Sequence, residues 1–303
     1  MRIAVVGSYG VGMTMSASRI PEAGETVLGG VFSLGPGGKG SNQAIAAARL
    51  GGHVDLLTIV GPDAFGDQAR QLWAAENVGH AHVRTGTGAT MIGFIMVEPG
   101  GENRILVAPG ALDELGESDV ERFAGEIAAA DLLVVSLEIP LATALAALRA
   151  GREAGTTTLL NPAPAVPLPR EAFGWIDYLT PNMSEARILA DAPGETDPDR
   201  LADALRAGGF GGALVMTLGG DGALVDEAGI RARVAPVRAP EVVDTTGAGD
   251  AFTAALAVRI AEGASLAEAV GFAAAAGAHA VGRAEVIPAL PHRSDVDALL
   301  AGA

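Results

Sequence analysis

The sequence Asp244-Thr245-Thr246-Gly247-Ala248-Gly249-Asp250 lies between a strand-like run that ends at Val243 and a long apolar segment, 251–261, with the composition of a helix. Gly247 and Gly249 permit a tight turn because they have no Cβ. The N–H groups at the start of the predicted helix, together with the helix dipole, favour binding of an anion. Asp250 falls in the first helical turn, where its carboxylate can take a proton beside that anion. Phosphoryl transfer to a hydroxyl requires this combination.

Taken alone, a Gly-x-Gly-Asp sequence has two interpretations. In the first it is a catalytic turn. In the second the glycines form an ordinary turn and Asp250 merely complements the helix dipole, which is about as common. The composition and the other motifs of the chain decide between them.

The composition argues against several classes of function. The 303 residues carry a formal charge of −16 without a Lys/Arg-rich run, so nucleic acid and anionic membranes are expected to be repelled. There is no cysteine, which excludes disulfides, thiolate metal sites and a cysteine nucleophile. The chain starts in an apolar strand-like run, 3–6, and its Ala/Gly-rich run 269–281 is shorter than the ~20 residues of a membrane span. We therefore expect a soluble cytoplasmic protein.

Most of the chain alternates between strand and helix patterns, which predicts an α/β fold with a mostly parallel sheet and helices on both faces. Two β-rich segments, 10–34 and 89–107, interrupt this alternation. The second contains the alternating run Met91–Val97 and the turn Pro99-Gly100-Gly101, a pattern typical of a hairpin. We predict that both segments form a small β-sheet lid outside a large domain of residues 1–9, 35–88 and 108–303. The predicted strands of the large domain include 54–60, 132–136, 157–160, 176–179 and 213–217.

Three further motifs bring glycines and polar side chains to helix starts or strand ends. Gly37-Gly38-Lys39-Gly40-Ser41-Asn42 opens a predicted helix, and its Lys and Asn side chains can donate to sugar hydroxyls. Thr180-Pro181-Asn182-Met183-Ser184-Glu185 has the pattern of a capping box, but it also offers the oxygen ligands that Mg²⁺ prefers. Thr217-Leu218-Gly219-Gly220-Asp221-Gly222 ends a strand at the edge where open α/β sheets bind ligands. Each motif alone is nearly as typical of a plain turn or cap.

Four motifs, in chain order, together resemble the ribokinase branch of the PfkB carbohydrate kinase family. They are Gly37-Gly38-Lys39-Gly40-Ser41-Asn42, Asn161-Pro162-Ala163-Pro164, the motif Thr180–Glu185 and the motif Asp244–Asp250. The resemblance covers essentially the whole chain, and residues 21–26 are similar to the ribokinase lid. It implies a large α/β domain, a small β-sheet lid and, in many members, a homodimer formed through the lids. It also implies ATP with Mg²⁺ as the phosphoryl donor and the primary hydroxyl of a sugar as the acceptor.

The resemblance further implies a role for individual residues. Asp250 matches the base, and Gly247, Ala248 and Gly249 match the residues whose N–H groups bind the transferred phosphoryl. Gly38, Lys39, Asn42 and Glu138 match sugar-side positions. The positions on the nucleotide side are matched by Asn182, Thr217, Gly219, Gly220, Asp221 and Gly222. Glu185 matches a position that reaches Mg²⁺ through water. Asp244 matches a position beside a monovalent cation such as K⁺.

The chain departs from this branch at two places. Members usually carry Asn and Asp where this chain has Gly10 and Gly12, and the Asp holds adjacent sugar hydroxyls. Loss of such charge-assisted hydrogen bonds, worth about 1.5–3 kcal/mol each, predicts that ribose is a poor acceptor. Members that bind a monovalent cation usually have Gly and Ser where this chain has Glu285 and Ala289, so the K⁺ site has weaker support.

We therefore expect an ATP-dependent, ribokinase-like sugar kinase. Three alternatives remain open. The first is a kinase of another ketose, polyol or nucleoside on the same scaffold. The second is a catalytically silent regulator that binds sugar or nucleotide, although such a protein has no need of Asp250. The third is a nicotinamide-dependent oxidoreductase, which the spacing of Gly7, Gly10 and Gly12 disfavours.

Overall fold

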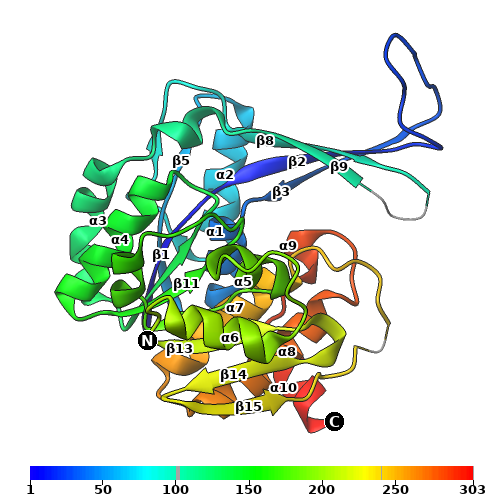
Figure 1. Cartoon of the computed structure of the whole chain (residues 1–303). Coiled ribbons are helices and arrows are strands. Elements are labelled where there is room, and N and C mark those ends of the chain that lie inside the picture. The colour runs from blue at the N-terminus through cyan, green and yellow to red at the C-terminus, as the bar shows by residue number, and fades with distance from the viewer. Residues whose placement is uncertain (100–102, 240, 303) are drawn as a thin grey trace.

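Figure 1 shows the computed structural model, which describes residues 1–99, 103–239 and 241–302. A nine-stranded sheet runs through the large body in the order β15-β14-β13-β12-β11-β10-β1-β4-β6. All neighbouring pairs are parallel except those that join β13 to β14 and β14 to β15 at one edge. The mostly parallel sheet predicted from the sequence is therefore confirmed. Its strands are β1 (Arg2–Val6), β4 (His53–Leu57), β6 (Val78–Gly79), β10 (Leu132–Ser136), β11 (Thr157–Asn161), β12 (Tyr178–Leu179), β13 (Ala213–Thr217), β14 (Ala223–Glu227) and β15 (Ile230–Val234).

Helices cover both faces of this sheet because its strands are apolar on both sides. In β1, Ile3 and Val5 belong to the core on one face, and Ala4 and Val6 belong to the core on the other. The first face packs against α1 (Lys39–Arg49), α2 (Ala64–Ala75), α7 (Ala248–Ala261), α8 (Leu266–Ala280), α9 (Val286–Ala289) and α10 (Arg293–Ala301). The second packs against α3 (Glu117–Ala129), α4 (Leu141–Ala154), α5 (Met183–Leu189) and α6 (Pro198–Ala207). No helix of the described chain has the length and apolar character needed to cross a bilayer.

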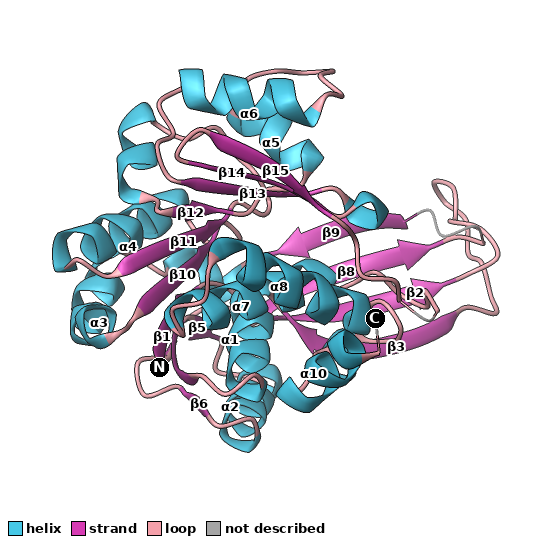
Figure 2. Ribbon diagram, turned by 90° about the horizontal axis from the view of Figure 1, so that it is seen from below, coloured by secondary structure: helices cyan, strands magenta, loops and turns pink. Residues whose placement is uncertain are grey.

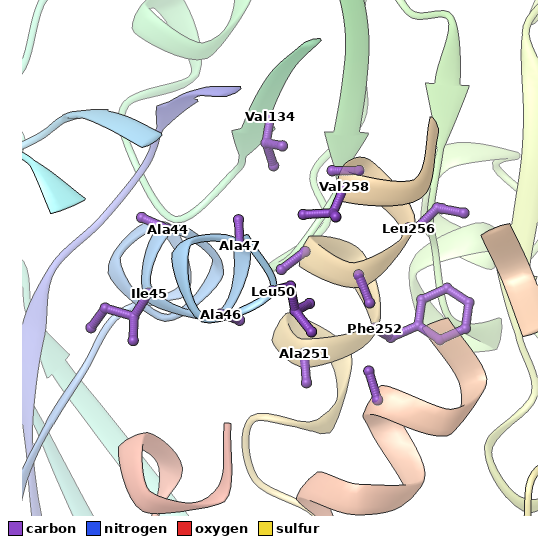
Figure 3. Close-up of a cluster of buried hydrophobic side chains, with 14 of the residues drawn as sticks. Ala44, Ile45, Ala46, Ala47, Leu50, Val134, Ala251, Phe252, Leu256 and Val258 are labelled. Carbon is purple, nitrogen blue, oxygen red and sulfur yellow. The ribbon is translucent and has the colours of Figure 1, made fainter. Parts of the chain in front are cut away.

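Small side chains bring α1 and α7 close together beneath the sheet. In Figure 3, Leu50, the residue that follows α1, lies beside α7 near Ala251, and Val134 of β10 lies above Ala47. Alanine at such contacts lets helix axes approach at the short end of the usual 8–10 Å range. The starts of the two helices also meet, since Asn42 and Gln43 of α1 donate hydrogen bonds to Asp250 of α7. Each start carries one of the predicted catalytic motifs.

The lid is a separate four-stranded sheet that projects from the large body (Figures 1 and 2). Its strands are β2 (Gly10–Ser16), β3 (Val31–Gly37), β8 (Met91–Val97) and β9 (Asn103–Ala108), in the order β3-β2-β8-β9. The predicted small sheet is thus confirmed, while Gly100 and Gly101 of its predicted turn lie outside the described residues. The assignment of 10–34 and 89–107 as a domain of its own remains a proposal. Two short strands, β5 (Ile59–Val60) and β7 (Arg84–Thr85), pair beside the body.

One strand expected from the sequence is absent from the described structure. The run that ends at Val243 is not in either sheet, and Val242 is largely exposed. The Val243 N–H instead donates to the Val281 carbonyl at 2.8 Å, at the end of α8. The chain has already left the antiparallel edge of the sheet at Val234, so this run meets the end of α8 through its backbone while Val242 and Val243 stay exposed. The predicted strand 54–60 is also divided, into β4 and β5.

Candidate active site

The turn before α7 depends on one glycine for its geometry. Gly247 has φ 82, in the left-handed region, and a Cβ at this position would lie 2.9 Å from Val286 Cγ1. Gly249 differs, because it is helical and no described atom lies within 4 Å of a Cβ built there. The first N–H groups of a helix have no acceptor within that helix, although Ala248 N–H reaches Thr245 O at 3.3 Å. Open space therefore adjoins the predicted anion-binding turn at Gly249.

Asp250 is buried and is held by two amide side chains from the start of α1. Its Oδ2 accepts a hydrogen bond from Asn42 Nδ2 at 2.8 Å, and its Oδ1 accepts one from Gln43 Nε2 at 3.0 Å. Burial raises the pKa of Asp250, while Lys39 and the two amide donors lower it in part. The result is a carboxylate with a fixed orientation and an increased affinity for a proton, as a general base requires.

Gln43 was not among the residues predicted from the sequence. Its Nε2 also donates to Asn161 Oδ1 at 3.1 Å, which ties the motif at 161–164 to the acid. The sequence contained one relevant indication, because two consecutive amides, Asn42 and Gln43, open a helix. Two adjacent helical residues do not usually face the same neighbour, so the sequence alone gives no reason to place both side chains on Asp250.

Lys39 stands among three acidic side chains. Its side chain is largely buried, which by itself lowers the pKa of Lys39, but attraction to Asp250, Glu138 and Glu185 raises that pKa overall. The ammonium therefore stays charged under the electrostatic attraction of three carboxylates that come from separate elements. A sugar hydroxyl or a transferred phosphoryl beside Lys39 meets a fixed positive charge.

Glu138 is positioned by the turn after β1 and by the start of α1. Its Oε2 accepts hydrogen bonds from Ser8 Oγ at 2.6 Å and from the Lys39 backbone N–H at 3.0 Å. Glycine at position 38 lets the start of α1 lie against the turn after β1. A Cβ on Gly38 would lie 2.6 Å from Tyr9 Cα, and Gly38 has a positive φ of 89. Ser8 was also missed by the sequence analysis, because its partner is far away in the chain.

Two buried amide oxygens beside Asp250, Asn42 Oδ1 and Gln43 Oε1, lack a hydrogen-bond partner among the described residues. Asn42 is only 5% exposed. A buried, unpaired polar atom costs about 1–3 kcal/mol. A hydroxyl of a bound molecule that donates to Asn42 Oδ1 removes this penalty.

Asn182 and Glu185 form the capping box that the sequence predicts for α5. Asn182 Oδ1 accepts from Glu185 N–H at 2.9 Å, and Glu185 Oε2 accepts from Asn182 N–H at 2.8 Å. Burial raises the pKa of Glu185, although the Asn182 N–H and Lys39 lower it in part. Because the cap uses Oε2, only Oε1 remains free of it to face Mg²⁺ or its waters. The described residues contain no cluster of three acidic or histidine side chains ready to hold a metal.

The two nucleotide-side motifs lie beside each other. Asn182 forms an isolated parallel bridge with Thr217, and Thr217 N–H donates to Pro181 O at 2.9 Å. The turn Gly219–Gly222 then follows between β13 and β14, with Gly219, Gly220 and Asp221 exposed. Backbone groups at the carboxyl ends of adjacent strands thus become available to a ligand.

The segment around Glu285 lies next to the turn before α7. Glu285 has φ 66 and ψ 151, a backbone region that is almost confined to glycine. Val286 packs against Gly247, and Arg49 Nη1 donates to the carbonyls of Ile287 at 2.8 Å and Leu290 at 2.6 Å. Asp244 Oδ1 is occupied locally, by Thr246 N–H at 2.9 Å and Thr246 Oγ1 at 2.7 Å.

Comparisons with known proteins identify the family of the chain. Residues 2–293 match the family described as pfkB family carbohydrate kinase. The chain is 36% identical to the ribokinase of Schizosaccharomyces pombe over 98% of this chain and 97% of that protein. It is 35% identical to the deoxyribokinase of Salmonella typhi over 83% of each. The structure of Arabidopsis thaliana ribokinase complexed with ribose and ATP superposes with a TM-score of 0.90 at 30% identity, over 99% of this chain and 98% of that one.

Proposed function

The chain belongs to the pfkB family of carbohydrate kinases and is an ATP-dependent sugar kinase of the ribokinase type. From that premise we propose that Asp250 removes the proton from a primary hydroxyl of the sugar while this oxygen attacks the γ-phosphorus of ATP. The O–P bond to ADP breaks, and ADP leaves with the bonding electrons. The observation that carries the proposal is the buried Asp250 carboxylate, fixed by Asn42 and Gln43 at the start of a helix.

Backbone groups stabilise the charge that develops on the phosphoryl group. N–H groups of Gly247, Ala248 and Gly249 face the transferred phosphoryl, aided by the dipole of α7. The open space at Gly249 and the exposed position of that residue support this assignment. On the acceptor side, Gly38, Lys39, Asn42 and Glu138 bind and orient the sugar.

The nucleotide lies along the strand ends that carry the remaining glycine turn. We assign ATP binding to Asn182, Thr217, Gly219, Gly220, Asp221 and Gly222. Oxygen donors suit Mg²⁺, so Glu185 Oε1 fits a water-mediated contact to the ion. Bound Mg²⁺ neutralises charge on the ATP phosphates. A monovalent cation beside Asp244 is the weaker assignment, because Thr246 already occupies one carboxylate oxygen.

ADP release in the presence of ATP and Mg²⁺, measured across pentoses, ketoses, polyols and nucleosides, tests the proposal. We expect at least one acceptor to give a phosphomonoester by ³¹P NMR, and we expect EDTA to stop the reaction. Comparison of K⁺ with Na⁺ tests the cation assignment. An acceptor that raises the melting temperature without any ADP release supports the regulator alternative instead.

The outer face of the lid supports a homodimer. Leu34, Met13, Phe94 and Leu106 are in register across all four strands, and three of them are exposed by 38–73%. An apolar sheet face of this kind is stabilised by a second sheet. We propose that two lids pair through it, and that the enzyme acts on small sugars in the cytoplasm, where ATP is available. Sedimentation velocity of wild type and Leu106→Lys tests the dimer, since the charge should yield monomers.

A further inference from the structure

Three glycines lie side by side across the lid, on the face opposite to Leu34 and Phe94. Gly12 of β2 is in register with Gly35 of β3 and with Gly93 of β8. Residues directly opposite one another in paired strands share a face of the sheet. We call Gly12, Gly35 and Gly93 the glycine row. Since neighbouring strands lie ~4.8 Å apart, the row offers about 10 Å of backbone without side chains.

The structure of the lid itself does not require these glycines. None of the three has a positive φ, and no described atom lies within 4 Å of a Cβ built on Gly35 or Gly93. A Cβ on Gly12 has its nearest neighbours at 3.8 Å, an ordinary contact. Each glycine within a strand lowers stability by roughly 0.5–1 kcal/mol relative to alanine. Such a position often marks the close approach of a ligand to the backbone.

The neighbouring row closer to the body has a different explanation. A Cβ on Gly10 would overlap the side chain of Met91, so packing accounts for this glycine. Met91 therefore fills the space beside Gly10 with an apolar group. It belongs to the same core cluster as Leu137 and Ile139, which flank Glu138. The end of β2 from which the glycine row extends also adjoins the acceptor side, because a Cβ on Gly38 would lie 2.8 Å from Gly10 N.

The large body and the lid present different chemistry to an acceptor that lies between them. The large body contributes Lys39, Glu138 and the unpaired, buried Asn42 Oδ1, all suited to hydroxyls. The lid contributes only glycine and Met91 in its two inner rows on strands β3, β2 and β8, and the sheet ladder engages the backbone groups. An acceptor that fits both sides presents hydroxyls to the body and a flat apolar surface to the lid.

We propose that the acceptor is a sugar that carries a flat ring through a glycosidic bond, and that this ring lies on the glycine row. The inference rests on the proposed sugar-kinase function and narrows its substrate class. A nucleoside and an aryl glycoside share this chemistry, and they are distinguished by the test below. Free pentoses leave the row empty.

The first test compares kcat/KM for ADP release with D-ribose, 2-deoxy-D-ribose, phenyl β-D-ribofuranoside, uridine and inosine. We expect at least one ring-bearing acceptor to exceed both free pentoses by ~10-fold or more, the range that differential burial of an apolar group supplies. A preference for uridine or inosine identifies a heterocycle, and a preference for the phenyl riboside identifies a plain aryl group. A wild-type enzyme that uses ribose or 2-deoxyribose at least as well as every ring-bearing sugar contradicts the inference but leaves the kinase function standing. Absence of ADP release with every acceptor contradicts the kinase function itself, and the inference with it.

The second test fills the glycine row. Gly93→Val places a side chain favoured in strands where no described atom obstructs its Cβ, so the variant should fold and melt no lower than wild type. We expect its kcat/KM for the preferred ring-bearing acceptor to fall by ~10-fold or more while that for ribose changes less than about 2-fold. Thr14→Val, two residues beyond Gly12 on the same face, is the matched control and should change neither. An equal loss for both kinds of acceptor in Gly93→Val overturns the inference.

Discussion

The acceptor side and the nucleotide side of the active site are built in opposite ways. On the acceptor side the side chain of Asp250 is buried and is fixed within the protein by hydrogen bonds from Asn42 and Gln43. On the nucleotide side, Gly219, Gly220 and Asp221 are exposed and belong to a short turn. The difference indicates where precision is needed. A base must be oriented in advance, whereas a nucleotide with its metal can order a glycine turn as it binds.

The largest effect is expected at the base. Asp250→Asn should lower kcat by ~10²–10⁴-fold, because general-base action is lost. ATP binding, measured by calorimetry with a non-hydrolysable analogue, should stay nearly unchanged, because the nucleotide side is built separately. Turnover within a few-fold of wild type would refute the assignment of Asp250. Loss of ATP binding would instead show that the two sides are not independent.

Two glycine substitutions in the turn before α7 distinguish a residue needed for the backbone conformation from one needed to leave room for the phosphoryl group. Gly249→Ala adds a methyl group in open space and should lower kcat by ~10²–10³-fold, with an unchanged melting temperature, because it crowds the phosphoryl position. Gly247→Ala should instead lower stability by about 1–3 kcal/mol, because φ is positive and Val286 lies against the added Cβ. Thermal melts and steady-state kinetics on both variants check this. Equal changes of kcat and of melting temperature in the two variants would contradict these separate roles.

The dependence of activity on pH sharpens the description of the acceptor side. The base acts only when it is ionised, so kcat/KM should fall as the pH drops through the raised pKa of Asp250. Asn42 donates to the ionised form, so Asn42→Ala raises that pKa further and moves the acidic limb to higher pH. Thr14→Val, in the lid, should keep the wild-type limb. An acidic limb that moves to lower pH in Asn42→Ala contradicts the proposed hydrogen bond.

The smallest effect concerns the segment beside the turn. Glu285→Gly should raise the free energy of unfolding by about 1 kcal/mol or more, because glycine adopts this backbone conformation without strain. Denaturant titration measures the change, and Glu285→Ala is the matched control, since it removes the carboxylate but keeps the strain. Equal stabilisation in both variants would assign the effect to charge instead of backbone geometry.

The parallel sheet and the lid could be predicted from the sequence because strand and helix patterns depend on residues that are neighbours in the chain. It also predicted the capping box of Asn182 and Glu185, whose partners lie three residues apart. It did not predict Gln43 or Ser8, because their partners, Asp250 and Glu138, are distant in the chain. The expected strand before the central motif was wrong for a related reason, since an apolar run does not reveal whether a sheet edge or a helix end receives it.

From the sequence alone Gly10 and Gly12 are equivalent, as two positions without the expected polar side chains. The structure separates them, because Met91 occupies the space beside Gly10 and only Gly12 belongs to the glycine row. That distinction depends on which strand pairs with β2. Such pairing cannot be read from either glycine alone.

The parallel pairing of β2 with β8 also has a consequence for folding. The register joins Gly10 to Met91, so α1, β4 and α2 lie within the loop that this pairing closes. The entropy of closing that loop delays the contact until the intervening chain has folded. We expect the lid to assemble last and to open first on heating, with the fastest amide hydrogen exchange of the β structure. The protein can then lose acceptor recognition while Asp250 and its amide partners remain in place, so inactivation by heat precedes unfolding of the large sheet.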